Sequence, residues 1–161
     1  MAEKYIGIDL NDKYAMVSQY THGMSEPGTF SMVTGSEIYQ IPACVSKDAD
    51  GSFVYGEEAR AYARQTGEAC IENLIKKALS DETAVLGQEE YEAAELLFLF
   101  TQMLIGLLIG SGEEKDPYVL AITTENMNAE YRKLFKRFAV WMKLPPERLL
   151  LLGYRESFYY Y

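Results

Sequence analysis

The sequence contains few of the residues that build metal sites and disulfide frameworks. Its 161 residues include only two cysteines, Cys44 and Cys70, and one histidine, His22. Their spacing fits no zinc-binding pattern, and two cysteines cannot supply the dense disulfide framework of a small secreted domain. We therefore expect a protein of the reducing cytoplasm. The opening residues MAEKYIGID agree with this location, because they lack the basic and apolar regions of a signal peptide.

Basic residues are scarce as well. The chain has 15 Lys and Arg against 24 Asp and Glu, which gives a formal net charge of −9 and a pI of about 4.7. An acidic surface of this kind repels a phosphate backbone, which excludes broad electrostatic binding to DNA or RNA. We therefore expect no nucleic-acid partner. A complex of a metal ion with a nucleotide remains compatible with this charge, because it needs only a local site.

The longest apolar run is too short to span a membrane. The stretch LLFLFTQMLIGLLIG covers residues 96–110, and Thr101 and Gln102 interrupt it. A spanning helix needs about 20 apolar residues, and no basic flank supports insertion. We expect a buried core helix and no membrane partner, with an oligomer interface or an interfacial membrane segment as the alternatives. The sequence also has no P-loop, no Gly-x-Ser-x-Gly elbow and no His-Glu-x-x-His motif.

The chain does contain an ordered series of strand and helix patterns. Strands are predicted from β-branched and aromatic runs, and helices from apolar residues spaced three and four apart. In chain order we predict strands at 4–10, 14–20 and 29–35, a hairpin of 43–47 and 52–56 around the turn 48–51, helices at 57–65, 68–79 and 88–110, a strand at 118–123, a helix at 125–144, a strand at 148–154 and the start of a helix at 155–161. This order predicts an α/β protein. Its mixed five-stranded sheet would combine an antiparallel meander with parallel strands, and it would have helices on both faces and a small hairpin insertion.

Four stretches carry a resemblance to a known superfamily. They are GIDL at 7–10, IPACVSKDADGSFVYGEEARAYA at 41–63, YVLAITTENMNAEYRKLFKRFAVWMKL at 118–144 and LLLLGYRES at 149–157. In order and spacing they resemble the first lobe of the actin, heat-shock chaperone (DnaK-type) and sugar-kinase ATPase superfamily. The resemblance implies a ribonuclease H-like fold, with residues 1–161 as a single lobe. It also implies that the chain is a fragment of a longer protein, whose missing second lobe is a partner.

The resemblance places a phosphate and metal region at the end of the first predicted strand. In that family an aspartate at the position of Asp9 orients Mg²⁺ through water, and a Gly-Thr-Thr loop wraps the phosphates with backbone N–H groups. Here the loop is Asn11, Asp12 and Lys13, which lacks both hydroxyls and adds a carboxylate where phosphate would lie. The implied cofactors are ATP and Mg²⁺. The alternative is that Asp9 caps a turn, since aspartate is common in turns.

Two further positions match functional positions of the superfamily. Glu156 corresponds to the glutamate that helps to position the attacking water, so the resemblance makes it the catalytic candidate. Lys76, with Lys77 beside it, lies near the position of the catalytic lysine. From the residues alone, Glu156 is also explained as a carboxylate at a helix start, where the helix dipole favours it. The two lysines are also explained as part of a solvated helix face.

The altered phosphate motifs determine the expected function. We expect a degenerate nucleotide-binding or scaffold module rather than an efficient enzyme. The first alternative is an active Mg-ATP-dependent ATPase or kinase, completed by the second lobe. The second is a ribonuclease H-like nuclease, in which Glu125, Glu130 and Glu156 would gather around two metal ions. The charge of −9 disfavours that alternative.

The last residues of the chain are strongly aromatic. After Glu156 the sequence reads Ser157, Phe158, Tyr159, Tyr160 and Tyr161. Large rings need a volume that a tight phosphate cleft lacks. We therefore predict that Phe158, Tyr159, Tyr160 and Tyr161 form a contact surface for a protein partner.

Overall fold

The computed structural model describes residues 3–109 and 117–159, with only the backbone described at Phe158 and Tyr159. The chain divides into two compact units. The first unit consists of residues 1–10, 16–40 and 104–161, and the second consists of residues 11–15 and 41–103.

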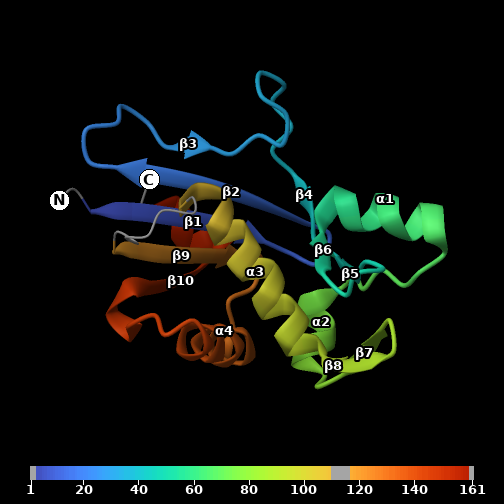
Figure 1. Cartoon of the computed structure of the whole chain (residues 1–161). Coiled ribbons are helices and arrows are strands. Elements are labelled where there is room, and N and C mark those ends of the chain that lie inside the picture. Colours follow the sequence, from blue (N-terminus) through green and yellow to red (C-terminus); the bar gives the residue numbers. More distant parts are fainter. Residues whose placement is uncertain (1–2, 110–116, 160–161) are drawn as a thin grey trace. The chain divides into compact units, whose positions relative to one another are not determined.

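A mixed sheet is the centre of the first unit. Its strands are β1 (Lys4–Leu10), β2 (Tyr14–Thr21), β3 (Gly28–Thr29), β9 (Tyr118–Thr124) and β10 (Leu149–Gly153). Their order is β10-β9-β1-β2-β3 (Figure 1). The strand β9 is parallel to both β1 and β10, whereas β2 and β3 are antiparallel. The predicted α/β class and the mixed sheet are therefore confirmed. The sheet has six strands rather than five, because the short strand β4 (Ile41–Pro42) pairs with the beginning of β2.

Alternation along the parallel strands creates the apolar face of this unit. In β1 the side chains of Ile6, Ile8 and Leu10 are buried, and in β9 those of Leu120 and Ile122 are buried. The register pairs Ile6 with Leu120 and Ile8 with Ile122. Because neighbouring residues of paired strands point to the same face, these side chains form one continuous apolar layer.

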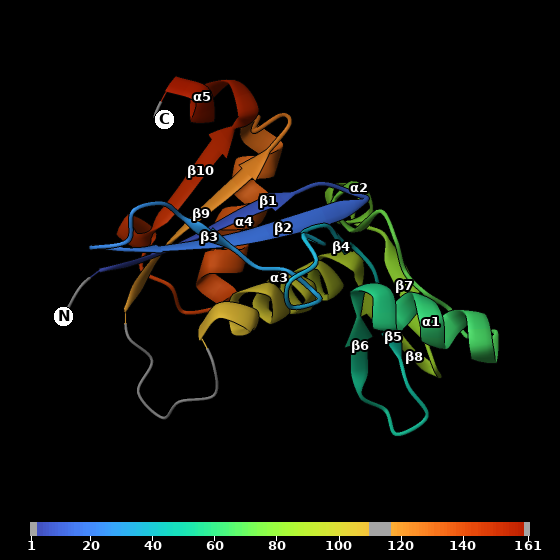
Figure 2. The same ribbon diagram turned by 90° about the horizontal axis from the view of Figure 1, so that it is seen from above.

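Helix α4 (Ala129–Trp141) packs against β10 in the first unit (Figures 1 and 2). Its N-cap is Asn128, whose side chain accepts a hydrogen bond from the Tyr131 backbone N–H. The buried side of the helix carries Leu134, Phe135 and Phe138. A short 3-10 helix, η1 (Pro146–Arg148), leads into β10, and α5 (Tyr154–Tyr159) follows at the end of that strand (Figure 2).

The second unit contains two hairpins and three helical segments. Its elements are β5 (Val45–Lys47), β6 (Phe53–Tyr55), α1 (Gly56–Thr66), α2 (Leu74–Leu79), β7 (Thr83–Leu86), β8 (Glu89–Glu92) and most of α3 (Ala93–Ile109). The β5–β6 hairpin is the predicted insertion. Asp48 closes its turn by accepting hydrogen bonds from the Asp50 and Ser52 backbone N–H groups, and Gly51 supplies the positive φ of 82°.

Helix α3 contains the long apolar run. Its side chains at Leu96, Leu97, Phe100 and Leu104 are completely buried, as predicted for a core helix. The prediction extended to Gly110, which lies outside the described residues. Among the helices that the structure describes, none has the length and hydropathy needed to cross a membrane.

The predicted third strand, 29–35, is wrong beyond its first residue. The strand β3 ends at Thr29. Past Phe30, the Ser31 hydroxyl donates to the Val33 carbonyl and accepts from the Ile38 N–H, and Gly35 adopts a φ of 81°. Local hydrogen bonds from serine have replaced the strand ladder.

Two predicted helices also begin later than expected. The helix predicted at 68–79 is formed only from Leu74 to Leu79, because Ile71 exchanges two backbone hydrogen bonds with Val45 in a β-bridge. The helix predicted from residue 88 begins at Ala93. The preceding residues form the β7–β8 hairpin, which the sequence prediction missed, around Gly87 with a φ of 63°.

Candidate functional site

The first unit brings the carboxyl ends of three parallel strands to one edge of its sheet. Ligands of α/β proteins commonly bind at such an edge. Asp9 lies there at the end of β1 and is partly exposed. Its Oδ1 accepts a hydrogen bond of 2.7 Å from the Tyr154 hydroxyl of α5. One oxygen of Asp9, the carboxylate predicted to orient a metal ion, is therefore already hydrogen-bonded to a tyrosine hydroxyl of the same unit.

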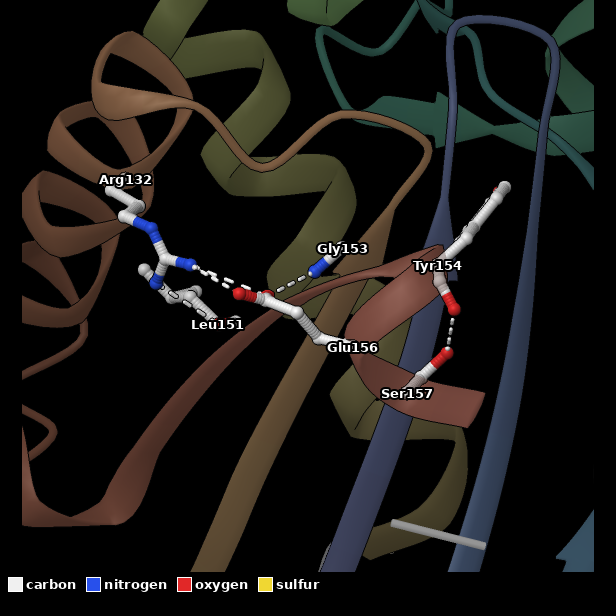
Figure 3. Close-up of polar contacts among 6 residues, drawn as sticks. All are labelled: Arg132, Leu151, Gly153, Tyr154, Glu156 and Ser157. Carbon is white, nitrogen blue, oxygen red and sulfur yellow. Dashed lines mark hydrogen bonds and ion pairs between the residues drawn. The ribbon is translucent and has the colours of Figure 1, made fainter. Parts of the chain in front are cut away.

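Glu156 has a structural role at the start of α5. It occupies the third position of the helix, and its Oε2 accepts a 2.8 Å hydrogen bond from the backbone N–H of Gly153, the residue before the helix (Figure 3). A glutamate at this position that bonds back to the N-cap N–H forms one half of a capping box. The explanation of Glu156 as a helix-start carboxylate therefore has direct geometric support.

Arg132 extends this polar cluster from α4. Its Nη2 lies 3.4 Å from Oε2 of Glu156, and its Nη1 donates to the Leu151 carbonyl at 3.1 Å. Figure 3 shows the guanidinium pointing from α4 toward the end of β10 and the start of α5. Because both groups are partly exposed, with side-chain exposures of 39% and 50%, this ion pair is a modest contributor to stability.

The loop of Asn11, Asp12 and Lys13 belongs to the second unit and forms hydrogen bonds within itself. The Asn11 side-chain oxygen accepts hydrogen bonds of 2.8 Å from the backbone N–H groups of Lys13 and Tyr14. The Asn11 N–H donates to the Tyr14 carbonyl at 3.0 Å. Three of the N–H groups that an anion-binding nest would present are therefore already used within the loop.

Asp12 of this loop bonds to the start of α2, also in the second unit. Its Oδ1 accepts from the Ile75 N–H at 2.9 Å and from the Lys76 N–H at 3.2 Å. The first N–H groups of a helix lack partners within the helix and attract anions. Here a carboxylate of the chain itself supplies that anion. Of the predicted site residues, Asp12 and Lys76 are thus brought together, but through the Lys76 backbone.

The two lysine side chains of α2 do not point to a shared phosphate-binding position within the described residues. Lys76 is exposed, and its side chain has no hydrogen-bond or ion-pair partner among the described residues. Lys77 lies 3.9 Å from Glu82. Over residues 3–109 and 117–159, no group of three or more His, Cys, Asp or Glu side chains is arranged to hold a metal ion.

One buried hydroxyl near the strand ends was missed by the sequence analysis. The Thr124 side chain is 2% exposed, and its Oγ1 has no hydrogen-bond partner within the described part of the chain. Alternation in β9 puts Thr124 on the face of Leu120 and Ile122, whereas Asp9 pairs with Thr123 on the other face. Thr124 is therefore not a neighbour of Asp9 in a common site.

A groove in the first unit was also missed. It lies between α4 and β10, and we call it the α4–β10 groove. It has a volume of about 320 Å³ and includes Arg132, Lys136, Val140, Leu144, Leu149 and Leu151 in its lining. The first three of these residues are spaced by four along α4, so helical periodicity alone could have placed them on one face.

Comparison with protein families assigns the chain to a group. A family model described as "Family of unknown function (DUF5716) C-terminal" matches residues 26–161, which is most of the sequence. The chain belongs to this family. No curated protein matches it.

Some of the features described above lie inside the range that matches the DUF5716 C-terminal family model, and others precede it. Asp9 and the loop of Asn11, Asp12 and Lys13 precede the matched residues, whereas the α4–β10 groove and Glu156 lie within them. The predicted aromatic contact surface lies outside the described side chains, so its placement stays a prediction.

Proposed function

We propose that this chain is a lobe of the actin- and chaperone-like ATPase type that acts as a scaffold, because its phosphate region is closed by its own side chains. The proposal includes a ribonuclease H-like fold. The strand order β10-β9-β1-β2-β3, with an antiparallel meander followed by two parallel strands, supports it. A cytoplasmic location is part of the proposal and agrees with two cysteines that are both unbridged.

The observation that carries this proposal is the pairing of the loop after β1. Asn11 uses the N–H groups of Lys13 and Tyr14, and Asp12 uses those of Ile75 and Lys76. A phosphate would have to displace these internal acceptors and approach the Asp12 carboxylate. Each lost hydrogen bond to a charged group costs about 1.5–3 kcal/mol. Tight binding of a nucleotide through this loop is therefore unfavourable.

The test is calorimetric titration of the full-length protein with Mg-ATP, so that a second lobe is present if the gene encodes one. We expect no heat of binding at millimolar ATP. A matched thermal-unfolding series gives an independent measure. A ligand at ten times its Kd would stabilise the fold by about 1.4 kcal/mol, and we expect no such increase.

A loop variant identifies the cause of weak binding. In N11G/D12T both internal acceptors are replaced by residues of the kind that the superfamily uses, which frees the backbone N–H groups. Gain of Mg-ATP binding in this variant would support a closed loop as the reason for the lost function. Millimolar or tighter binding by the natural protein that D9N abolishes would contradict the proposal and favour an active nucleotide site.

A further inference from the structure

The α4–β10 groove combines a cationic end with an apolar end. Along α4 the lining runs from Arg132 and Lys136 to Val140, and Leu149 of β10 contributes to the opposite wall. Lys136 and Val140 are four residues apart, which corresponds to about 6 Å along a helix. The groove therefore offers a positive charge and an apolar surface about one helical turn apart.

This groove lies in the one strongly basic part of an acidic chain. Residues 129–150 contain six Lys or Arg and two Glu, a net charge of +4, while the rest of the chain carries −13. On α4 the exposed side chains of Lys133 and Lys136 have no ion-pair partner among the residues that the structure describes. Arg132 is already paired with Glu156, so Lys136 is the cation of the groove lining that a partner can use. A local positive charge favours a negatively charged partner at this surface and raises its association rate.

The apolar end is open to solvent. Val140 is 79% exposed although it lines the groove, and the adjacent Trp141 is 39% exposed. The groove volume is at the lower limit of pockets that enclose drug-sized molecules, about 300–1,000 Å³. Cationic and apolar residues continue along the exposed side of α4 beyond the cavity itself. This extended surface suits a protein segment better than an enclosed small molecule.

From these observations we infer that the α4–β10 groove binds an acidic, amphipathic segment of a partner protein. The segment places an apolar side chain against Val140 and Leu149 and a carboxylate near Lys136. An amphipathic helix in an apolar groove is a recurrent mode of peptide recognition, with anchors three and four residues apart. This inference is independent of the proposed loss of the phosphate site, because none of its residues takes part in that loop.

A fluorescent side chain lies next to the groove in the sequence. Trp141 is the only tryptophan of the chain, follows Val140 directly, and stacks on Phe138 with ring centroids 6.2 Å apart. Trp141 is 39% exposed and lies outside the groove lining, so a bound segment that extends past Val140 would change the surroundings of the indole. Its emission can therefore be followed without a label on the protein.

The experiment uses a fluorescein-labelled peptide of about 15 residues, long enough to form a helix, with Leu at helical spacing and Glu at the other positions. Binding to the natural chain is measured by polarisation and by Trp141 emission in an unlabelled repeat. We expect saturable binding, which is lost when every Glu is replaced by Lys and when every Leu is replaced by Ser. No binding by the Glu/Leu peptide, or equal binding by the Lys version, would overturn the inference.

Two pairs of variants locate the binding surface. K136E is compared with K133E, which makes the same charge change on α4 outside the groove lining. V140D is compared with V85D, which makes the same change at another exposed valine, in β7. We expect K136E and V140D to weaken binding about tenfold or more, K133E to weaken it clearly less than K136E, and V85D to change it less than about twofold. All four positions are exposed, so folding should be retained and is checked by circular dichroism.

The same series of measurements distinguishes the peptide segment from two other occupants, a nucleic acid and a second copy of the chain. Equal losses in K136E and K133E would indicate diffuse electrostatic attraction and overturn the groove assignment. Competition by a single-stranded DNA oligonucleotide that is stronger than that of the unlabelled peptide would assign the basic surface to nucleic acid. A concentration-dependent dimer that V140D converts to a monomer, seen by sedimentation, would show that a second copy occupies the groove and would also overturn the inference.

Discussion

Asp12 is the residue whose replacement should most directly affect the second unit. Its carboxylate accepts two backbone hydrogen bonds at the start of α2. We predict that Asp12→Ala lowers the free energy of unfolding by about 1–2 kcal/mol, as expected for the loss of a capping acceptor. Asp12→Asn keeps one acceptor oxygen and should cost less. Chemical denaturation measures both values.

A matched control for Asp12 is available in the same unit. Asp50 is exposed, and its side chain has no partner among the described residues. Asp50→Ala therefore makes the same change in net charge without removing a hydrogen bond. Equal effects of the two alanine substitutions would show that charge, and not capping, determines the stability change.

Glu89 is predicted to make the stability of the fold depend on pH in the acidic range. The Lys47 ammonium and then the Tyr91 hydroxyl donate hydrogen bonds to this carboxylate, and they hold the pKa of Glu89 below its usual value of 4.5. A carboxyl whose folded pKa is lowered stabilises the fold above the unfolded pKa. That contribution is lost as the pH falls through the folded pKa. We predict that natural protein is more stable than Glu89→Gln at pH 7 and that the difference shrinks as the pH falls below 4.5.

The measurement for Glu89 is thermal unfolding across this pH range. Glu90→Gln, at an exposed neighbour in β8, serves as the control because the Glu90 side chain has no partner among the described residues. A stability gap that does not shrink as the pH is lowered below 4.5 would rule out the carboxylate's charge as its origin. The effect should be small, since Glu89 is 65% exposed.

At the scale of elements, helix α5 separates a structural from a catalytic role of Glu156. Gln can take the place of Glu in a capping box. We therefore predict that Glu156→Gln is nearly neutral, whereas Glu156→Ala lowers the free energy of unfolding by about 0.5–1 kcal/mol and speeds amide hydrogen exchange at Gly153. If Glu156 acted in water activation, Glu156→Gln would instead abolish nucleotide turnover without affecting stability.

The element predictions succeeded where a segment has one strong local pattern. The parallel strands β1, β9 and β10 follow from β-prone and apolar runs, and the helix α4 follows from helical spacing of apolar residues. The errors fell where short segments have competing partners. Ile71 has helical spacing, yet its backbone N–H and carbonyl form a tertiary β-bridge with Val45. The β7–β8 hairpin depends on the positive φ of Gly87. A glycine can adopt a positive or a negative φ, so its presence alone did not predict the turn.

At the scale of the whole molecule, net charge predicts solubility. The chain carries −9 at neutral pH and has a pI of about 4.7. Repulsion between molecules is weakest where the net charge is zero. We predict a solubility minimum near about pH 4.7, measured by turbidity over a pH series. Addition of salt should weaken the attraction between the basic residues 129–150 and the acidic remainder of other molecules. A minimum above about pH 6 would contradict this prediction.

The sequence by itself determined the class of fold, the main strands, the apolar helices and the acidic character of this protein. Those properties depend on local periodicity and composition, which can be read along the chain. The resemblance of its motifs to a known superfamily also directed attention to Asp9, Asp12 and Glu156. The sequence could not assign their partners, because hydrogen-bond partners such as Tyr154 for Asp9, 145 residues away, are set by tertiary packing.

Only the tertiary structure decided that the loop after β1 is internally satisfied and that α4 and β10 enclose a groove. Asp12 meets the start of α2 across more than 60 residues of sequence, and Arg132 and Leu149 come from different elements. A single sequence contains the side chains of such sites but not their juxtaposition. The physical reason is that folding satisfies polar groups and buries apolar ones with whichever segments the fold brings together.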